Sequence, residues 1–378
     1  MGTEKGGILF MNARMIRFGI ALVLFVITSA LPSFGQMPVP PGTTAVAQGI
    51  LGPRGLKFGP DGNLYVATSG APTQDATPNS CSVGGGPWLG NTTGTIVKVD
   101  AQGNVTTVAT GFASTFNPPT GSALGVADVA FLDGELYAVT SGGGCSHGNP
   151  AQPNMVAKVD AATGNWSLVA NLSAAAASDP LANTDPADYQ QDGVFYSLIA
   201  ARGKLYAVEA NHGHIWSVTK KGGVEMVTDI SALADHWIGP TSLVASEGGL
   251  IVGTLGTFPI TPGASMLLSL KPGCDTTAAC GPGTLHVTGS VSGFTTIVSL
   301  AIGPDGLLYL LELSAAAGFP NPGAGKVVRV NGDGTVSDVA IGLSVPTGMT
   351  FGPDGYLYVS NWGAAPAPIG QILKVAVQ

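Results

Sequence analysis

The sequence has few charged, aromatic and cysteine residues. Charged residues make up 10% of the 378 residues, aromatic residues make up 7%, and there are four cysteines. The formal net charge of −8 argues against nucleic acid and anionic membrane surfaces as partners. No H-E-x-x-H metal motif and no phosphate-binding loop is present. The chain therefore offers no sequence pattern for a zinc protease or a nucleotide-binding enzyme.

Glycine and proline are abundant instead, with 56 and 27 copies, and they punctuate a repeat. The stretch PRGLKFGPDGNLYVA (53–67) returns as VSLAIGPDGLLYLLE (298–312) and as PTGMTFGPDGYLYVS (346–360). Gly-Pro-Asp-Gly is strong turn chemistry, because Pro fixes φ, Asp can bond its own backbone and Gly accepts positive φ. An apolar run on each side of such a turn predicts a β-hairpin, and a recurring hairpin indicates a repeat architecture.

Six units align on a Leu-Tyr-type marker in their second strand. The markers are Leu64-Tyr65, Leu136-Tyr137, Leu205-Tyr206, Leu250-Ile251, Leu308-Tyr309 and Leu357-Tyr358. Each marker is followed by a third alternating strand, and most units add a Gly-led turn and a fourth strand. This spacing predicts an all-β, six-bladed propeller with four antiparallel strands per blade.

The last unit lacks its fourth strand, and an unassigned strand, TTAVAQG (43–49), precedes the first unit. We therefore expect residues 43–49 to complete the last blade, which leaves no free sheet edge. The up-and-down strand order also predicts that one face carries short turns and the other carries the long loops. The long segments are 69–94, 111–124, 141–153, 172–193, 230–240, 254–264 and 313–325. Function is expected on the long-loop face, because loops on a rigid scaffold carry sites.

Residues 1–35 have the pattern of a signal peptide, followed by one propeller domain over residues 36–378. Arg14 and Arg17 precede the apolar run 19–30, and Ser33-Phe34-Gly35 has the small-x-small form of a cleavage site. The alternative, an uncleaved membrane anchor, requires a longer apolar run. No later segment is long enough to span a bilayer. A secreted or periplasmic location follows, and cleavage would change the net charge to −10.

An even number of cysteines in an exported chain predicts disulfides. Cys274 and Cys280 close the small loop CDTTAAC and are expected to pair. Cys81 and Cys145 lie in two other long loops, and they can pair if those loops are neighbours.

The order of these motifs resembles the ScyD/ScyE family of exported propellers, which is related to NHL-repeat and SMP-30-like propellers. The similarity rests on residues 53–67, on PTSL (240–243) with GTLGTFPITPGAS (253–265), on GFTTIVSLAIGPDGLLYLLEL (293–313) and on PTGMTFGPDGYLYVSNWG (346–363). It covers nearly the whole chain after residue 35. The chain departs from the family at 192–198, DGVFYSL, where we expect Asp-Ser-Asn-Pro-Tyr-Gly-Leu. The resemblance implies a secreted propeller more firmly than any reaction.

The first strand of each blade lies innermost, so equivalent positions there are expected near the central channel. These positions are Gly55, Asp128, Ser197, Ser242, Ser299 and Gly348. A lone carboxylate in a narrow channel needs a cation or hydrogen-bond donors. Asp128 is therefore either a Ca²⁺ ligand or a carboxylate satisfied by backbone N–H and hydroxyl groups.

The second strand of each blade is expected to end at the long-loop face, and three blades have an acidic or amide residue there: Glu209, Glu312 and Asn361. Related hydrolytic propellers bind Ca²⁺ with acidic and amide side chains, so by fold analogy these residues are candidate ligands alongside Asp128. The alternative is hydrogen bonding within and between blades. His212 and His214 share a strand face, but two histidines are weak evidence for zinc.

Two functional classes follow from these observations. The first is a binding protein whose long-loop face holds a small molecule, a glycan or a protein partner. The second is a Ca²⁺-dependent propeller enzyme, either a lactonase-like hydrolase or, as the family name implies, a factor in scytonemin-type aromatic pigment biosynthesis. They differ in geometry, because the enzyme needs its oxygens within about 2.3–2.6 Å of one ion.

Overall fold

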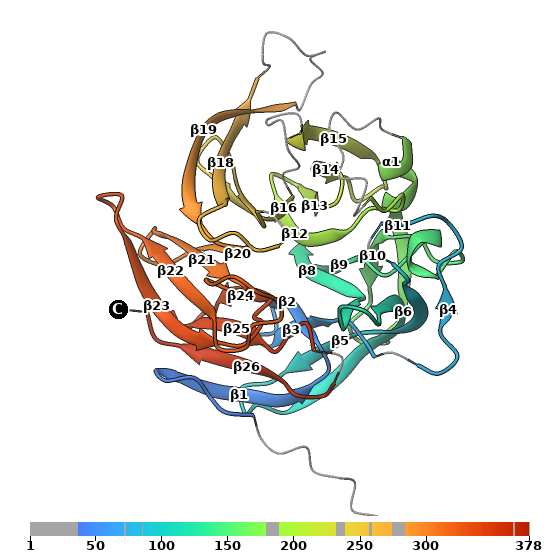
Figure 1. The fold of residues 1–378 in the computed structure, drawn as a ribbon, viewed down its shortest axis with the longest axis horizontal. Coiled ribbons are helices and arrows are strands. Elements are labelled where there is room, and N and C mark those ends of the chain that lie inside the picture. The colour runs from blue at the N-terminus through green and yellow to red at the C-terminus, as the bar shows by residue number, and fades with distance from the viewer. Residues whose placement is uncertain are drawn as a thin grey trace, which may run out of the picture. The chain divides into compact units, whose positions relative to one another are not determined.

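A computed structural model describes residues 37–71, 73–84, 86–178, 189–231, 239–256, 259–273, 284–365 and 367–377. Residues 36–378 form one compact unit. Six antiparallel sheets are arranged around a central axis, which confirms the predicted six-bladed propeller (Figure 1).

The four strand positions of each blade match the repeat seen in the sequence. The innermost strands are β2 (Pro53–Phe58), β8 (Val126–Leu132), β12 (Phe195–Ala201), β16 (Pro240–Ser246), β20 (Ile297–Ile302) and β24 (Gly348–Phe351). The second strands are β3 (Leu64–Thr68), β9 (Glu135–Thr140), β13 (Lys204–Glu209), β17 (Gly249–Thr254), β21 (Leu308–Glu312) and β25 (Leu357–Asn361). The third strands are β5 (Leu89–Val99), β10 (Met155–Val159), β14 (His214–Val218), β18 (Ser265–Pro272), β22 (Gly325–Val330) and β26 (Gly370–Val375). The outer strands are β6 (Val105–Asn117), β11 (Trp166–Asn171), β15 (Val224–Asp229), β19 (Leu285–Phe294), β23 (Val336–Leu343) and β1 (Thr43–Ile50).

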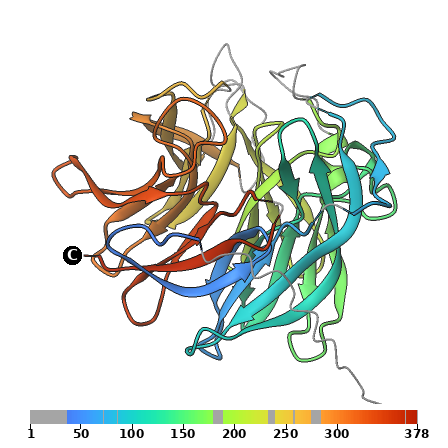
Figure 2. The same ribbon diagram turned by 60° about the horizontal axis from the view of Figure 1, so that its bottom comes forward.

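The ring closes as predicted, because β1 is the outer strand of the last blade. It pairs antiparallel with β26, with Thr43 opposite Val375 and Ile50 opposite Gly370. Figure 2 shows the blue first strand running beside the red last strand. Ala47 and Ile50 are buried against the core, so the closure adds apolar packing to the backbone ladder.

The repeated turn motif holds aromatic rings in place on the short-turn face. The turn Asp accepts a hydrogen bond from the Tyr hydroxyl of the same blade in three pairs: Tyr65–Asp61 at 3.0 Å, Tyr309–Asp305 at 2.9 Å and Tyr358–Asp354 at 2.8 Å. Each Tyr ring meets a Phe of the next blade edge to face: Phe131, Phe351 and Phe58, respectively. The Gly-Pro-Asp-Gly and Leu-Tyr pattern therefore joins neighbouring blades as well as forming a turn.

Two segments expected to be loops contain additional strand. In blade one, β5 and β6 extend beyond the other third and outer strands, and β4 (Thr77–Pro78) and β7 (Ser122–Leu124) add to the same sheet. A short helix, α1 (Leu172–Ser178), begins the segment after β11. In the described parts of the chain, no helix has the length and apolar character needed to span a bilayer. The predicted signal peptide lies outside the described residues.

Candidate functional site

Five of the six positions predicted near the central channel line one small cavity, and Ser242 is not among its lining residues. Gly55, Asp128, Ser197, Ser299 and Gly348 line this cavity, which has about 20 Å³ open to the centre of a water molecule. That space is enough for about one water. A Cβ on Gly55 would lie 1.9 Å from Oδ1 of Asp128. Glycine at this position therefore leaves the room that the carboxylate fills.

Hydrogen-bond donors of the chain itself satisfy both oxygens of Asp128. The Val129 N–H donates to Oδ1 at 2.8 Å. The Leu198 N–H and the Ser197 hydroxyl, both from the next blade, donate to Oδ2 at 2.8 Å and 3.2 Å. Burial raises the pKa of Asp128 to about 6, while the Lys57 charge and these hydrogen bonds limit the rise. The arrangement holds an anion by donors from two blades.

Glu209, Glu312 and Asn361 share one structural task at the end of strand two. Each side-chain oxygen accepts the N–H of a residue that precedes strand one of the same blade: Val194 at 2.6 Å, Thr295 at 2.9 Å and Ser344 at 2.7 Å. Glu209 also accepts the N–H groups of Asn211 and His212, at 2.8 Å and 2.6 Å. Burial raises the pKa of Glu312, which the Thr295 hydrogen bond and Lys326 oppose.

These contacts do not fit a Ca²⁺ site made by the four predicted residues. Ca²⁺ takes six to eight oxygen ligands, whereas N–H or O–H groups of the chain donate to at least one side-chain oxygen of each of the four residues. A metal site needs several ligand atoms close together. Among the described residues, two groups of three His, Cys or acidic side chains have ligand atoms within 4.8 Å of one another: Cys81/Cys145/Asp192 and Glu209/His212/His214. Asp128 belongs to neither group.

A charged residue that the sequence analysis did not single out lies one residue before the channel ring. In four blades, the pairing of strands one and two is irregular just before the ring residue, and in blade one the irregularity between Pro53 and Leu56 includes the ring residue Gly55. This irregularity gives strand one an extra residue. In blade one the irregular stretch includes Arg54, which is buried. The guanidinium carbon of Arg54 lies 5.1 Å from the centroid of the Tyr196 ring in blade three. The contact joins blades that are not adjacent, so it crosses the end of the channel on the long-loop side.

The long loops form an apolar pocket, which we call the long-loop pocket. Its volume is about 240 Å³, and its lining includes Phe319, Pro320, Pro322, Val345 and Trp362. Val345 and Trp362 have φ values of +44° and +59°. Bulky residues rarely adopt positive φ, and such strain costs about 1–3 kcal/mol per residue and is commonest at functional sites. The Trp362 N–H donates to the Ser344 carbonyl at 2.7 Å, which holds the two segments together.

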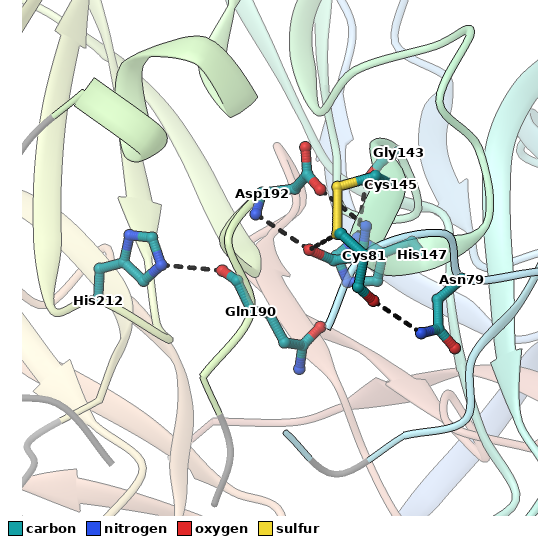
Figure 3. The surroundings of a disulfide bond; sticks show 9 residues. Asn79, Cys81, Gly143, Cys145, His147, Gln190, Asp192 and His212 are labelled. Carbon is teal, nitrogen blue, oxygen red and sulfur yellow. Dashed lines mark hydrogen bonds between the residues drawn. A yellow bond between two sulfur atoms is a disulfide. The ribbon is translucent and has the colours of Figure 1, made fainter. Parts of the chain in front are cut away.

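A disulfide joins two other long loops (Figure 3). Cys81 and Cys145 are bonded, with a Cα–Cα distance of 5.4 Å. The two loops are therefore neighbours, as the conditional prediction required. Cys274 and Cys280 lie outside the described residues, so their pairing stays a prediction.

Cys145 of the disulfide belongs to a stretch with the G-x-S-x-G spacing of a hydrolase nucleophile turn, Gly144 to Gly148. Ser146 is fully buried, and its hydroxyl accepts the Asp192 N–H at 3.2 Å. His147 instead lies with Nδ1 at 2.7 Å from the Gly143 carbonyl. Burial lowers the pKa of His147. The Ser, His and Asp side chains here do not form a catalytic triad.

The two blade-three histidines are packed inside the blade. His212 stacks on Tyr189 with ring centroids 5.3 Å apart, and its Nε2 lies 2.9 Å from the Gln190 carbonyl. His214 meets the Trp216 ring edge to face at 5.6 Å. Both histidines therefore make packing contacts within the blade.

Comparison with solved structures finds proteins of similar fold. A gluconolactonase from Xanthomonas campestris matches with a TM-score of 0.51 at 12% identity, over 90% of this chain and 96% of that one. A calcium-binding regucalcin from Agrobacterium tumefaciens matches with a TM-score of 0.53 at 16% identity, over 89% and 94%. A PQQ-bound aldose sugar dehydrogenase from Streptomyces coelicolor matches with a TM-score of 0.53 at 15% identity, over 89% and 99%.

At these identities the likeness establishes the fold alone. No protein-family model matches the sequence, and no curated protein matches it. The ScyD/ScyE resemblance therefore stays a prediction from the motifs.

Proposed function

We propose that this protein is an exported ligand-binding propeller that holds a small molecule in the long-loop pocket. The observation that carries the proposal is the pairing of strain with an apolar cavity. Val345 and Trp362 both line the pocket, and both have positive φ. Such strain persists only where the surrounding structure over-determines the backbone, and it clusters at active sites and ligand clamps.

The pocket suits a compact, mainly apolar ligand or the apolar part of a glycan or protein partner. Its lining is aromatic, proline-rich and aliphatic, with Thr120 and Ser122 as hydroxyl groups at its edge. Small-molecule sites are typically apolar cavities with a few polar groups. The lining comes from the blade-one extension and from loops of blades five and six, so the rigid ring fixes the pocket walls.

Fluorine NMR on protein labelled with 5-fluorotryptophan tests this site directly. The chain has five tryptophans, and a Trp362→Phe variant assigns the Trp362 resonance. Titration with 2-naphthol, an uncharged flat probe, should shift the Trp362 signal. Trp166, which stacks on Phe112 with centroids 4.8 Å apart, is an internal control and should not move. An unchanged Trp362 signal at millimolar probe would contradict the proposed site.

Export rests on the signal-peptide pattern of residues 1–35 and has a separate test. Intact-mass analysis of protein from the periplasm or culture medium should give a chain that begins near Gln36. A full-length chain in the cytoplasmic fraction would refute a secreted or periplasmic location.

A second candidate is a Ca²⁺-dependent, lactonase-like enzyme, including the pigment-biosynthesis role implied by the ScyD/ScyE resemblance. Its support is that solved propellers of this fold include a gluconolactonase and a calcium-binding regucalcin. The donors around Asp128 and Glu209 count against it. Melting curves in chelator and in millimolar Ca²⁺ test whether the protein binds this ion. Ca²⁺ at a hundredfold excess over its Kd would add about 2.7 kcal/mol to the free energy of unfolding. A rise in Tm lost in Asp128→Ala would favour the enzyme, and no rise would exclude this site.

A further inference from the structure

The opposite end of the channel opens into a second cavity, which we call the short-turn bowl. Its volume is about 450 Å³, within the range of small-molecule sites. Residues near the ends of all six innermost strands line it: Phe58, Phe131, Ala200, Ala245, Ile302 and Phe351. These residues are equivalent in the repeat, and they converge only because the ring closes.

One half of the bowl is aromatic and rigid. Phe58, Phe131 and Phe351 belong to the neighbouring blades one, two and six, whereas the other three blades contribute Ala200, Ala245 and Ile302. Each Phe ring is held edge to face by a Tyr at centroid distances of 4.9–5.2 Å. Those Tyr hydroxyls are in turn bonded to the turn aspartates. The aromatic wall is therefore preorganised before any ligand arrives.

Lys57 is the one charged residue among the described residues that line this bowl. It also lines the narrow cavity that contains Asp128, and its charge lowers the pKa of that carboxyl group. No hydrogen bond or ion pair within 4.0 Å links the Lys57 ammonium to the described part of the chain. The other lysines that face carboxylates on this side form such pairs, as Lys374 does with Asp354 at 2.7 Å. Lys57 thus presents a positive charge without a direct hydrogen-bonded partner at the base of the bowl, and the Asp128 carboxyl group is the opposite charge that acts on it.

We propose that the short-turn bowl binds a small organic monoanion with a flat apolar body. The anionic group pairs with Lys57, and the body packs against the Phe58, Phe131 and Phe351 wall. A charge-assisted hydrogen bond in a partly desolvated site is stronger than a neutral one, and aromatic faces favour flat ligands. This site is on the opposite face from the long-loop pocket and stands independently of it.

Isothermal titration with naphthalene-2-carboxylate, and with its uncharged methyl ester as the matched ligand, tests the proposal. Lys57→Met should weaken carboxylate binding by about 10- to 100-fold, the range expected for losing a hydrogen bond to a charged group. It should leave ester binding unchanged, and Lys57→Arg should retain carboxylate binding. Ala245→Trp, at an exposed position of the wall, should weaken carboxylate binding by blocking the bowl.

Two control variants separate this site from general effects and from the long-loop pocket. Lys221→Met removes an exposed lysine in a short turn of the same face, and Trp362→Ala alters the opposite face. Both should bind the carboxylate like the wild type. The proposal is overturned if the wild type does not bind the carboxylate at millimolar concentration. Equal binding by Lys57→Met, or loss of binding only in Trp362→Ala, would overturn it as well.

Discussion

Asp128 gives the propeller a pH dependence that one substitution can remove. Its folded-state pKa is about 6, against an ordinary value of 3.8. At about 1.4 kcal/mol per pH unit between the two values, the ionised carboxylate costs the fold about 3 kcal/mol. Because the folded-state pKa is raised, protonation of Asp128 stabilises the folded state. This contribution to the free energy of unfolding is complete below the unfolded-state pKa, and it is lost as the pH rises through about 6.

The Asp128→Asn variant should lose this titration. Between pH 4 and pH 7.5, the free energy of unfolding of the variant relative to wild type should rise by about 2.5 kcal/mol. For roughly 340 folded residues, an unfolding entropy of about 2.1 cal/mol/K per residue converts this change to about 3–4 °C in Tm. Other titrating groups, including Glu312, are common to both proteins, so their contributions cancel in the difference.

Thermal or urea unfolding of both proteins across this pH range measures the difference. Ser197→Ala is the matched second variant, because it removes a donor that favours the ionised form. Ser197→Ala should raise the folded-state pKa of Asp128, so the free energy of unfolding should fall at a higher pH than in the wild type. Parallel stability curves for Asp128→Asn and wild type would refute the reasoning, since they would mean that the carboxyl group has equal pKa values in both states.

Other perturbations have equally definite outcomes. The Cys81→Ser/Cys145→Ser double variant should lose about 4 kcal/mol of unfolding free energy, from the entropy of a loop with a sequence separation of 64 residues; equal urea midpoints with and without reductant would contradict this. Glu209→Gln should lose about 3 kcal/mol, because three backbone N–H groups converge on the carboxylate, while the exposed control Glu225→Gln should stay within about 1 kcal/mol in the same melts. Deleting β1 (Thr43–Ile50) should produce self-association on size-exclusion chromatography, because β26 becomes an open edge; a monomeric, cooperatively folded deletion would show that closure is dispensable.

The sequence by itself determined the repeat, the number of blades and the closure. Turn chemistry in Gly-Pro-Asp-Gly and the alternation around Leu-Tyr act over about fifteen residues, so a linear reading recovers them. The strand at 43–49 was identifiable because the last unit lacks a fourth strand. Asp128 was placed at the channel because the blades can be aligned.

Only the tertiary structure decided which side chains meet. The partners of Asp128 include Ser197 and Leu198, from the next blade. The irregular pairing in strand one is not encoded by the alternation, so the position of Arg54 opposite Tyr196 could not be read from the sequence. The short-turn bowl is made of residues up to about 300 positions apart, and ring closure alone sets their distances. Local interactions thus fixed the blades, whereas the sites depend on contacts between blades that no local pattern specifies.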